Sequence, residues 1–279
     1  IEDSVRESLR GKTTAIVNVA GVVDFNPPLD EALHVNAFGM QSVVALARDL
    51  GSPPLLHTST CYVAGQRTGQ IDEVDPRLHP FPRAGELEDL HWDPVREIAE
   101  CVDVVEMVRH RASDAFRQSD FRDEARRRLR EKGEPERGTA LEAELAKVRR
   151  RFEEDELARL GKERAGFWGW PNTYTYTKSI GEQILCTSGL PFAIVRPAVV
   201  ESALAFPRPG WNEGITTSAP IMYLSMKGMT GMPATDEAVL DVVPVDMVSA
   251  GMILALAELV RGEARPLYQL GTSDTNPLT

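Results

Sequence analysis

Apolar positions along the chain follow two spacings, one typical of strands and one typical of helices. Four short apolar runs are predicted to be buried strands: residues 14–19, 54–59, 192–196 and 267–270. Four segments repeat apolar residues every three or four positions and are predicted to be helices: residues 4–10, 30–50, 174–187 and 246–260. Because strands and helices alternate, the pattern predicts an α/β fold with a doubly wound parallel sheet.

A long stretch from about Gly65 to Pro171 departs from this alternation, and ordinary connections are far shorter. Two apolar stripes at helical spacing lie in residues 95–108 and 141–152, and a Lys-Gly-Glu-Pro break at residues 132–135 separates them. We therefore predict one domain over residues 1–279 with a helical hairpin inserted at residues 86–166. The charges on its outer faces are mixed in sign, which favours a solvated face over a docking surface.

Composition excludes several classes of function. The net charge is -11, which argues against a nucleic-acid backbone as the main partner because phosphate binding needs clustered positive charge. The longest apolar helical stretch, residues 247–260, is shorter than the roughly 20 residues that span a bilayer, so we expect no transmembrane helix and a cytoplasmic location. The three Cys and five His are scattered, and we expect no metal site.

The strongest chemical signal is the sequence Tyr-Thr-Tyr-Thr-Lys at residues 174–178. Tyr174 and Lys178 are one helical turn apart and share a face. A neighbouring cation favours the ionised form of a phenol, so we expect Lys178 to lower the pKa of Tyr174 and make it a proton donor and acceptor near neutral pH. The spacing alone is a weak signal, and the surrounding segments must support it.

Hydroxyl groups cluster where the second predicted strand ends, at Thr58, Ser59 and Thr60. Doubly wound sheets bind ligands at the carboxyl ends of their strands, where a hydroxyl can hydrogen-bond a substrate carbonyl. We expect Thr60 to be the catalytic hydroxyl, with Ser59 as second choice. For Thr58 we accept the simpler explanation that threonine suits a strand end.

A turn of small residues follows the first predicted strand. Such a turn lets the backbone approach a nucleotide closely, so we predict cofactor contacts at Asn18, Ala20 and Gly21. Small residues also occur at strand ends for packing reasons. Asn36 lies in the next helix and is either a cofactor contact or a structural hydrogen-bond partner of nearby backbone.

The third predicted strand ends at Arg196 and Pro197. Pro197 stiffens this exit, and we expect it to leave the amides of Ala198 and Val199 free to contact a cofactor. Arg196 is a ligand contact or a member of a structural ion pair. Further on, Asp246 is predicted to be the N-cap of the last helix. Four aromatic residues could line an apolar channel or pack in the core: Trp168, Trp170, Phe206 and Trp211.

Taken together, these segments resemble an extended short-chain dehydrogenase/reductase with a Rossmann-like fold. Other segments narrow the resemblance to the fatty acyl-CoA reductases of the male-sterility type: Val23-Asp24-Phe25-Asn26, Asn172 to Lys178, Val200-Glu201-Ser202, Pro207-x-Pro209-Gly210-Trp211, Val243-Pro244-Val245-Asp246 and Asn276-Pro277-Leu278-Thr279. The resemblance covers nearly the whole chain outside the helical insertion, and an enlarged connection before the Tyr-Lys helix is also a feature of that family.

The resemblance implies NADPH-dependent reduction of a long-chain fatty acyl-CoA thioester to the aldehyde and on to the fatty alcohol. It implies that Tyr174 donates a proton to the developing oxyanion, that Lys178 holds the nicotinamide ribose, and that Thr60 hydrogen-bonds the carbonyl. A long-chain substrate is compatible with peripheral contact with a membrane, and self-association is left open.

One departure from the family concerns its opening Gly-rich strand-turn-helix, which cradles the pyrophosphate. No such motif stands in that context here, so we predict that three amino-terminal strands are missing from this chain and that the chain alone is inactive. Three alternatives stay open: a carrier-protein thioester reductase, a sugar-nucleotide epimerase or dehydratase, and a non-catalytic nucleotide-binding or scaffold module.

Overall fold

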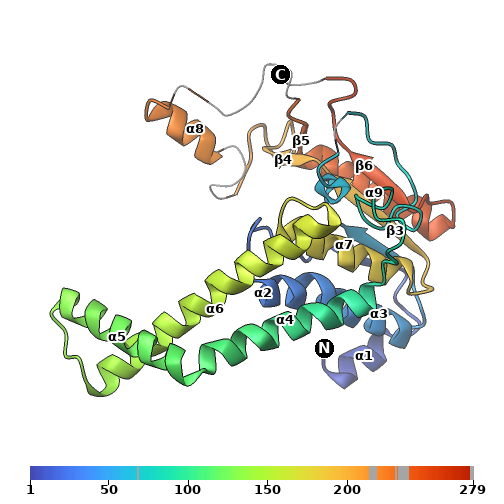
Figure 1. Cartoon of the computed structure of the whole chain (residues 1–279). Coiled ribbons are helices and arrows are strands. Elements are labelled where there is room, and N and C mark those ends of the chain that lie inside the picture. Colours follow the sequence, from blue (N-terminus) through green and yellow to red (C-terminus); the bar gives the residue numbers. More distant parts are fainter. Residues whose placement is uncertain (68, 214–218, 230, 232–238, 277–279) are drawn as a thin grey trace.

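The centre of the protein is a parallel sheet with helices on both faces (Figure 1). The computed structural model describes residues 1–67, 69–213, 219–229, 231 and 239–276. Four parallel strands lie in the order β1-β2-β3-β6: β1 (Ile16–Asn18), β2 (Leu55–Thr58), β3 (Phe192–Pro197) and β6 (Leu267–Leu270). This arrangement confirms the predicted α/β class. A separate parallel pair, β4 (Val199–Glu201) and β5 (Val242–Pro244), was not predicted.

Helices make up the rest of the described secondary structure. They are α1 (Asp3–Leu9), α2 (Leu29–Ala32), the π-helix η1 (Leu33–Phe38), α3 (Gly39–Asp49), the 3₁₀-helix η2 (Cys61–Ala64), α4 (Pro94–Ser113), α5 (Ala115–Lys132), α6 (Gly138–Trp168), α7 (Thr173–Cys186), α8 (Ala219–Met226) and α9 (Val245–Arg261). The predicted helix over residues 30–50 is therefore interrupted by a wider π turn.

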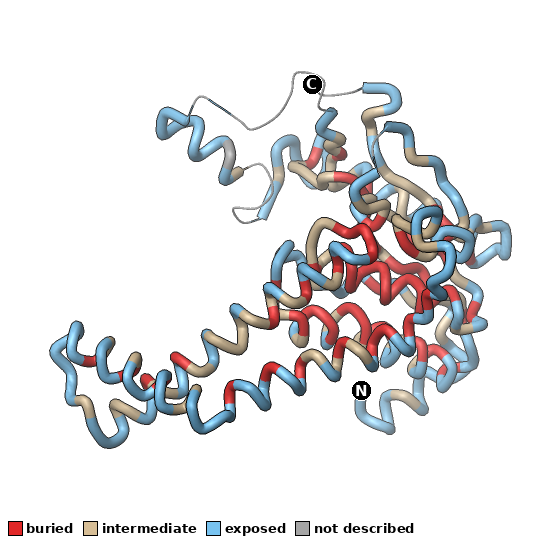
Figure 2. The backbone as a smooth tube through the Cα atoms, in the orientation of Figure 1, coloured by how far each residue is buried: buried red, intermediate tan, exposed pale blue. Residues whose placement is uncertain are grey.

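Alternating side chains of the strands pack against different helices. Leu55 of β2 and Ile194 of β3 join the main core with residues of α3 and α7. Leu56 and Val195, the next residues along the same strands, pack with α9 on the opposite face. Period-two alternation therefore places two layers of helix around one sheet, and the buried residues concentrate there (Figure 2).

Helices α4, α5 and α6 form an arm that extends away from the sheet (Figure 1). The predicted hairpin of two helices is wrong, because the arm contains three. The extra break is at Asp114, whose carboxylate accepts a hydrogen bond from the backbone N–H of Phe116 at 2.9 Å and caps α5. Phe121 and Phe152 pack at 5.2 Å between ring centroids and join α5 to α6.

The base of the arm packs on α7, the helix that carries Tyr174. Buried Glu97 of α4 accepts hydrogen bonds from Arg164 Nε at 2.7 Å and Trp168 Nε1 at 2.8 Å, both from α6. The phenol of Tyr176 on α7 also donates to Glu97, and it lies 3.0 Å from Cys101 Sγ. This buried polar cluster joins three helices of distant sequence.

The last helix begins differently from the prediction. Pro244 is the N-cap of α9, so Asp246 lies in its first turn. Its carboxylate instead accepts backbone N–H groups from Leu204, Ala205 and Phe206 at 2.9, 2.8 and 3.0 Å. These three bonds hold the pKa of Asp246 down at about 2. Asp246 therefore anchors a loop to the helix.

Candidate active site

Tyr174 lies in the first turn of α7, where the chain turns back over the ends of the strands. The N-cap Asn172 accepts the backbone N–H of Thr175 at 2.9 Å and starts the helix. The half-buried ring of Tyr174 packs edge-on against Phe25, with 5.9 Å between centroids. Burial raises the pKa of Tyr174 above its ordinary value, and the nearby Thr60 side chain opposes that rise.

Thr60 meets Tyr174 from the carboxyl end of β2. It is buried, and its Oγ1 also accepts the backbone N–H of Tyr62 at 3.3 Å, which caps η2. The first-choice hydroxyl of the sequence analysis thus lies beside the tyrosine. Two neighbouring hydroxyl groups are suited to hold one carbonyl oxygen between them.

Lys178 follows Tyr174 by one turn and is buried. Its Nζ donates to the carbonyl oxygen of Thr58 at 2.7 Å, which leaves two further N–H donors on the amine. Burial lowers the pKa of Lys178 to about 8, while the carboxylate of Glu182 raises it. The expected lowering of the Tyr174 pKa is wrong for this state of the protein, because burial of the phenol dominates.

The turn after β1 passes close to the lysine. A Cβ atom on Gly21 would lie 3.1 Å from Lys178 Nζ and 3.5 Å from Asn36 Oδ1. The side-chain oxygen of Asn18 accepts the backbone N–H of Ala20 at 3.1 Å and shapes the turn. The structure therefore brings Gly21 beside the Tyr-Lys pair, as a site that needs close backbone approach requires.

His57 is a buried residue of this region that the sequence analysis missed. Its Nδ1 lies 3.3 Å from Asn18 Nδ2, and since the Asn18 oxygen accepts from Ala20, the amide nitrogen is the donor. Burial and the charge of Lys178 hold the pKa of His57 well below its usual value, so the imidazole is neutral and carries its proton on Nε2. Strand alternation could have signalled it, because His57 shares a face with Leu55.

Asn36 has a structural role. Its Oδ1 accepts the backbone N–H of Val22 at 3.2 Å, and its Nδ2 donates to Thr177 Oγ1 at 2.9 Å. The backbone of the π-helix approaches α7 so closely that a Cβ on Gly181 would lie 2.6 Å from the Asn36 carbonyl oxygen. Asn36 was expected to be either a cofactor contact or a structural hydrogen-bond partner, and these contacts support the structural role.

Ser59, the second-choice hydroxyl, is buried one residue before Thr60. Its Oγ has no hydrogen-bond partner among the residues that the structure describes. Its backbone N–H donates to the Val195 carbonyl at 2.7 Å, so strand pairing fixes its position. Thr60, and not Ser59, lies close enough to Tyr174 to affect its pKa, and this separates the two candidates.

The exit from β3 corrects another expectation. The backbone N–H of Ala198 donates to the Leu270 carbonyl at 2.9 Å, and that of Val199 donates to the Asp241 carbonyl at 3.0 Å. The prediction that these amides are free is wrong, because β6 and the segment before β5 already occupy them. Pro197, the last residue of β3, has no N–H, and its cofactor contact stays a prediction.

Arg196 forms a buried ion pair with Glu182 of α7. Its Nε and Nη2 donate to the two carboxylate oxygens at 2.9 and 2.6 Å. Glu182 stands one turn beyond Lys178 on the same helix, a spacing that could have identified it. The pair fixes α7 against β3 and supports the structural alternative for Arg196.

The aromatic residues divide into two groups. Trp168 and Trp170 are buried in a cluster with Trp92, which supports packing rather than a channel. Phe206 is 76% exposed, and Trp211 is partly exposed. No group of three potential metal-ligating side chains occurs in the described part of the chain. Within the same residues, none of the helices has the length and apolar character to cross a bilayer.

Comparisons with known proteins agree with this geometry. A profile of the family described as male sterility protein matches residues 1–252. Fatty acyl-CoA reductase 8 of Arabidopsis thaliana is 30% identical over 99% of this chain and 49% of its own length. The alcohol-forming fatty acyl-CoA reductase of Simmondsia chinensis is 26% identical over 99% of this chain and 49% of its own. The chain thus spans about half the length of these relatives.

Solved structures agree on the fold. The terminal R domain of the myxalamid PKS-NRPS pathway has a TM-score of 0.53 and 17% identity, covering 97% of this chain and 46% of that one. UDP-glucose 4-epimerase of Brucella ovis, solved with NAD, has a TM-score of 0.53 and 12% identity, covering 99% of this chain and 62% of that one. The family profile and the reductase relatives together show that this chain belongs to the male-sterility fatty acyl-CoA reductase family of the extended short-chain dehydrogenases/reductases.

Proposed function

We propose that the protein containing this chain reduces a long-chain fatty acyl-CoA thioester with NADPH, first to the aldehyde and then to the fatty alcohol. The observation that carries the proposal is the position of Tyr174 on α7, one helical turn from the buried amine of Lys178, which donates to the Thr58 carbonyl at the end of β2, with Thr60 beside the phenol. This arrangement sits at the carboxyl ends of parallel strands, where the fold binds ligands. Family membership supports the acyl-CoA substrate.

The residues of this site fit the nicotinamide end of the cofactor. Lys178 has two N–H donors for a ribose, and Gly21 allows the turn to approach it closely. The cofactor supplies the hydride in each reduction step.

Each side chain has a defined task in this mechanism. Thr60 and Tyr174 hydrogen-bond the thioester carbonyl oxygen, and Tyr174 gives its proton as negative charge develops there. Lys178 supports that transfer, since a nearby cation favours the phenolate that Tyr174 leaves behind. The resulting hemithioacetal collapses to the aldehyde and free CoA, and the same pair of hydroxyl groups serves the second reduction.

The test uses the full-length protein, NADPH and palmitoyl-CoA, with CoA release and lipid products measured together. Tyr174→Phe removes the proton and is expected to lower kcat by roughly 10² to 10⁴-fold. Tyr268→Phe is the matched control, because Tyr268 lies on β6 and bonds to Glu258 outside the site. Full activity in Tyr174→Phe would refute the mechanism.

The same assay tests the substrate and cofactor. Activity on a carrier-protein thioester without activity on acyl-CoA would contradict the substrate assignment, and equal kcat/KM with NADH would contradict the preference for NADPH. We also propose a cytoplasmic location with peripheral membrane contact, which fractionation of cells producing the full-length protein would check.

A further inference from the structure

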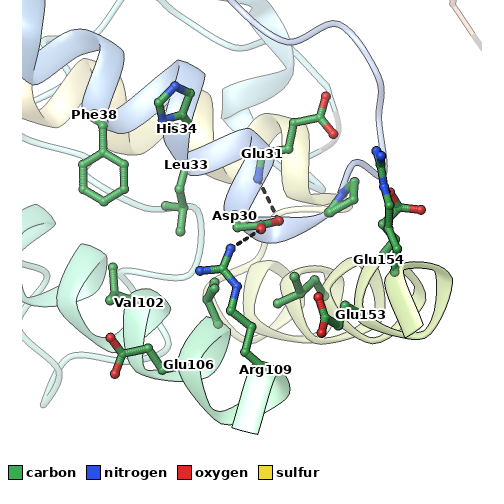
Figure 3. Close-up of a pocket in the computed structure, with 14 residues that line it drawn as sticks. Asp30, Glu31, Leu33, His34, Phe38, Val102, Glu106, Arg109, Glu153 and Glu154 are labelled. Carbon is green, nitrogen blue, oxygen red and sulfur yellow. Dashed lines mark hydrogen bonds and ion pairs between the residues drawn. The ribbon is translucent and has the colours of Figure 1, made fainter. Parts of the chain in front are cut away.

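A groove separates the base of the arm from the body of the protein (Figure 3). It has a volume of about 690 Å³ and lies between α2 with the π-helix, α4 and α6. Its apolar lining includes Leu33, Phe38, Val102, Val105 and Leu157. Leu33, Val105 and Leu157 are buried at its floor, and Phe38 and Val102 are partly exposed along it. A recess with an apolar floor and a charged rim is a candidate interaction site.

The rim of the groove is acidic. Five carboxylates and two arginines line it, which gives a net charge of -3 with His34 neutral: Asp30, Glu31, Glu106, Glu153 and Glu154, with Arg109 and Arg150. Arg109 pairs with Asp30 at 2.9 Å, and Arg150 pairs with Glu154 at 2.7 Å. Glu31 and Glu106 are exposed and have no ion pair among the residues described.

The arm also carries the opposite charge. Helix α5 has seven basic and four acidic residues, a net charge of +3, although the whole chain has -11. Arg122 and Arg126 are exposed one helical turn apart, and neither makes an ion pair within the described ranges. Helix α5 lies at the end of the arm away from the sheet (Figure 1).

We propose that the groove binds α5 of a second copy of this chain, and that α5 of the first copy binds the groove of the second. Helix α6 has 31 residues, about 46 Å, and the groove residues lie near its middle while α5 packs along its outer half. In the proposed pair, the two arms lie antiparallel about a two-fold axis, with each basic helix against the partner's acidic groove. Such an isologous pair makes the same contact twice.

Charge favours this occupant. A chain with a net charge of -11 repels its own copies at long range, and surfaces of opposite local charge offset that repulsion where they meet. The groove and α5 meet that requirement, with net charges of -3 and +3. The arm thus becomes a contact surface as well as a solvated one.

The test is a charge swap in the full-length protein, followed by sedimentation equilibrium. The double variant Glu31→Arg/Glu106→Arg and the double variant Arg122→Glu/Arg126→Glu are each expected to raise the dimer Kd by roughly tenfold or more. An equimolar mixture of the two is expected to form heterodimers with the wild-type Kd, because both symmetric contacts then pair opposite charges. Asp103→Arg is the control, since Asp103 is exposed on α4 outside the groove.

Several outcomes would overturn the proposal. A wild-type protein that is monomeric across the accessible concentration range excludes the second copy as occupant. A dimer with the same Kd in both double variants uses another surface. If both double variants dimerise weakly and their mixture does not recover the wild-type Kd, the charges do not meet across the interface. If a basic helix of another protein occupies the groove in place of the second copy, the proposed occupant is wrong.

Discussion

Burial of Lys178 has a measurable effect on stability that depends on pH. Its ordinary pKa is 10.5, and in the folded protein burial lowers it to about 8. Between these two values the unfolded chain binds the proton and the folded chain does not, so the free energy of unfolding rises with pH. The difference of about 2.5 units corresponds to roughly 3 kcal/mol that the folded protein gains between pH 8 and pH 10.5.

The variant Lys178→Met isolates this effect from all other titrating groups. At pH 7 the variant is expected to unfold with a higher free energy than the wild type, by about 2 kcal/mol, because it avoids burying a charge but loses the hydrogen bond to Thr58. The advantage is expected to vanish near pH ~9.5 and to reverse to a deficit of about 1 kcal/mol at pH 10.5, where the wild type has gained its full ~3 kcal/mol. Urea unfolding of both proteins from pH 7 to pH 10.5 measures the difference.

The informative quantity is the slope of that difference. At its steepest it should approach 1.4 kcal/mol per pH unit, the value for one proton. A difference that stays constant from pH 7.5 to pH 10.5 would show that Lys178 titrates normally in the folded protein. The burial argument would then be wrong, whatever the catalytic role of the residue.

Two further changes test the packing around the site. Glu182→Leu leaves Arg196 buried without its partner and is expected to lower the free energy of unfolding by about 3–5 kcal/mol. The double variant Glu182→Leu/Arg196→Met is expected to recover most of that loss. If urea unfolding shows the double variant to be no more stable than Glu182→Leu alone, the ion-pair argument is wrong. Gly65→Ala places a Cβ 2.4 Å from Pro82 Cγ, whereas Gly69→Ala, also at positive φ, has no neighbouring atom within 4 Å of its Cβ. Gly65→Ala is therefore expected to lower the melting temperature more than Gly69→Ala does. Equal decreases in thermal unfolding would show that backbone strain alone matters.

The fold was predictable where the sequence has long patterns. Each strand of the main sheet lies within two residues of its predicted apolar run. The signal is clearest for the central strands β2 and β3, which pack on both faces and are therefore largely apolar. The three-residue strands β4 and β5 contain too few positions to show a period. The π-helix was not predicted because apolar spacing in residues 30–50 does not distinguish it from an α-helix.

The site was predictable in its residue types and less so in its electrostatics. Thr60 was predicted to be the catalytic hydroxyl because hydroxyls at a strand end face the ligand region, and it lies near Tyr174. The direction of the Tyr174 pKa shift was not predictable from the sequence, because it depends on how much of the ring other segments cover. The hydrogen bonds that occupy the amides of Ala198 and Val199 come from segments more than 40 residues away in sequence, which no local motif encodes.

The π-helix has a consequence for how this site varies among relatives. A π turn contains one residue more than the α-helical turn it replaces, so deletion of a single residue within Leu33–Phe38 would restore a regular α-helix. Such a deletion would rotate Asn36 by about 100° about the helix axis and remove its amide from Val22 and Thr177, while the flanking helices kept their positions. Helix length, as well as residue identity, thus determines whether a relative keeps this hydrogen-bonded corner.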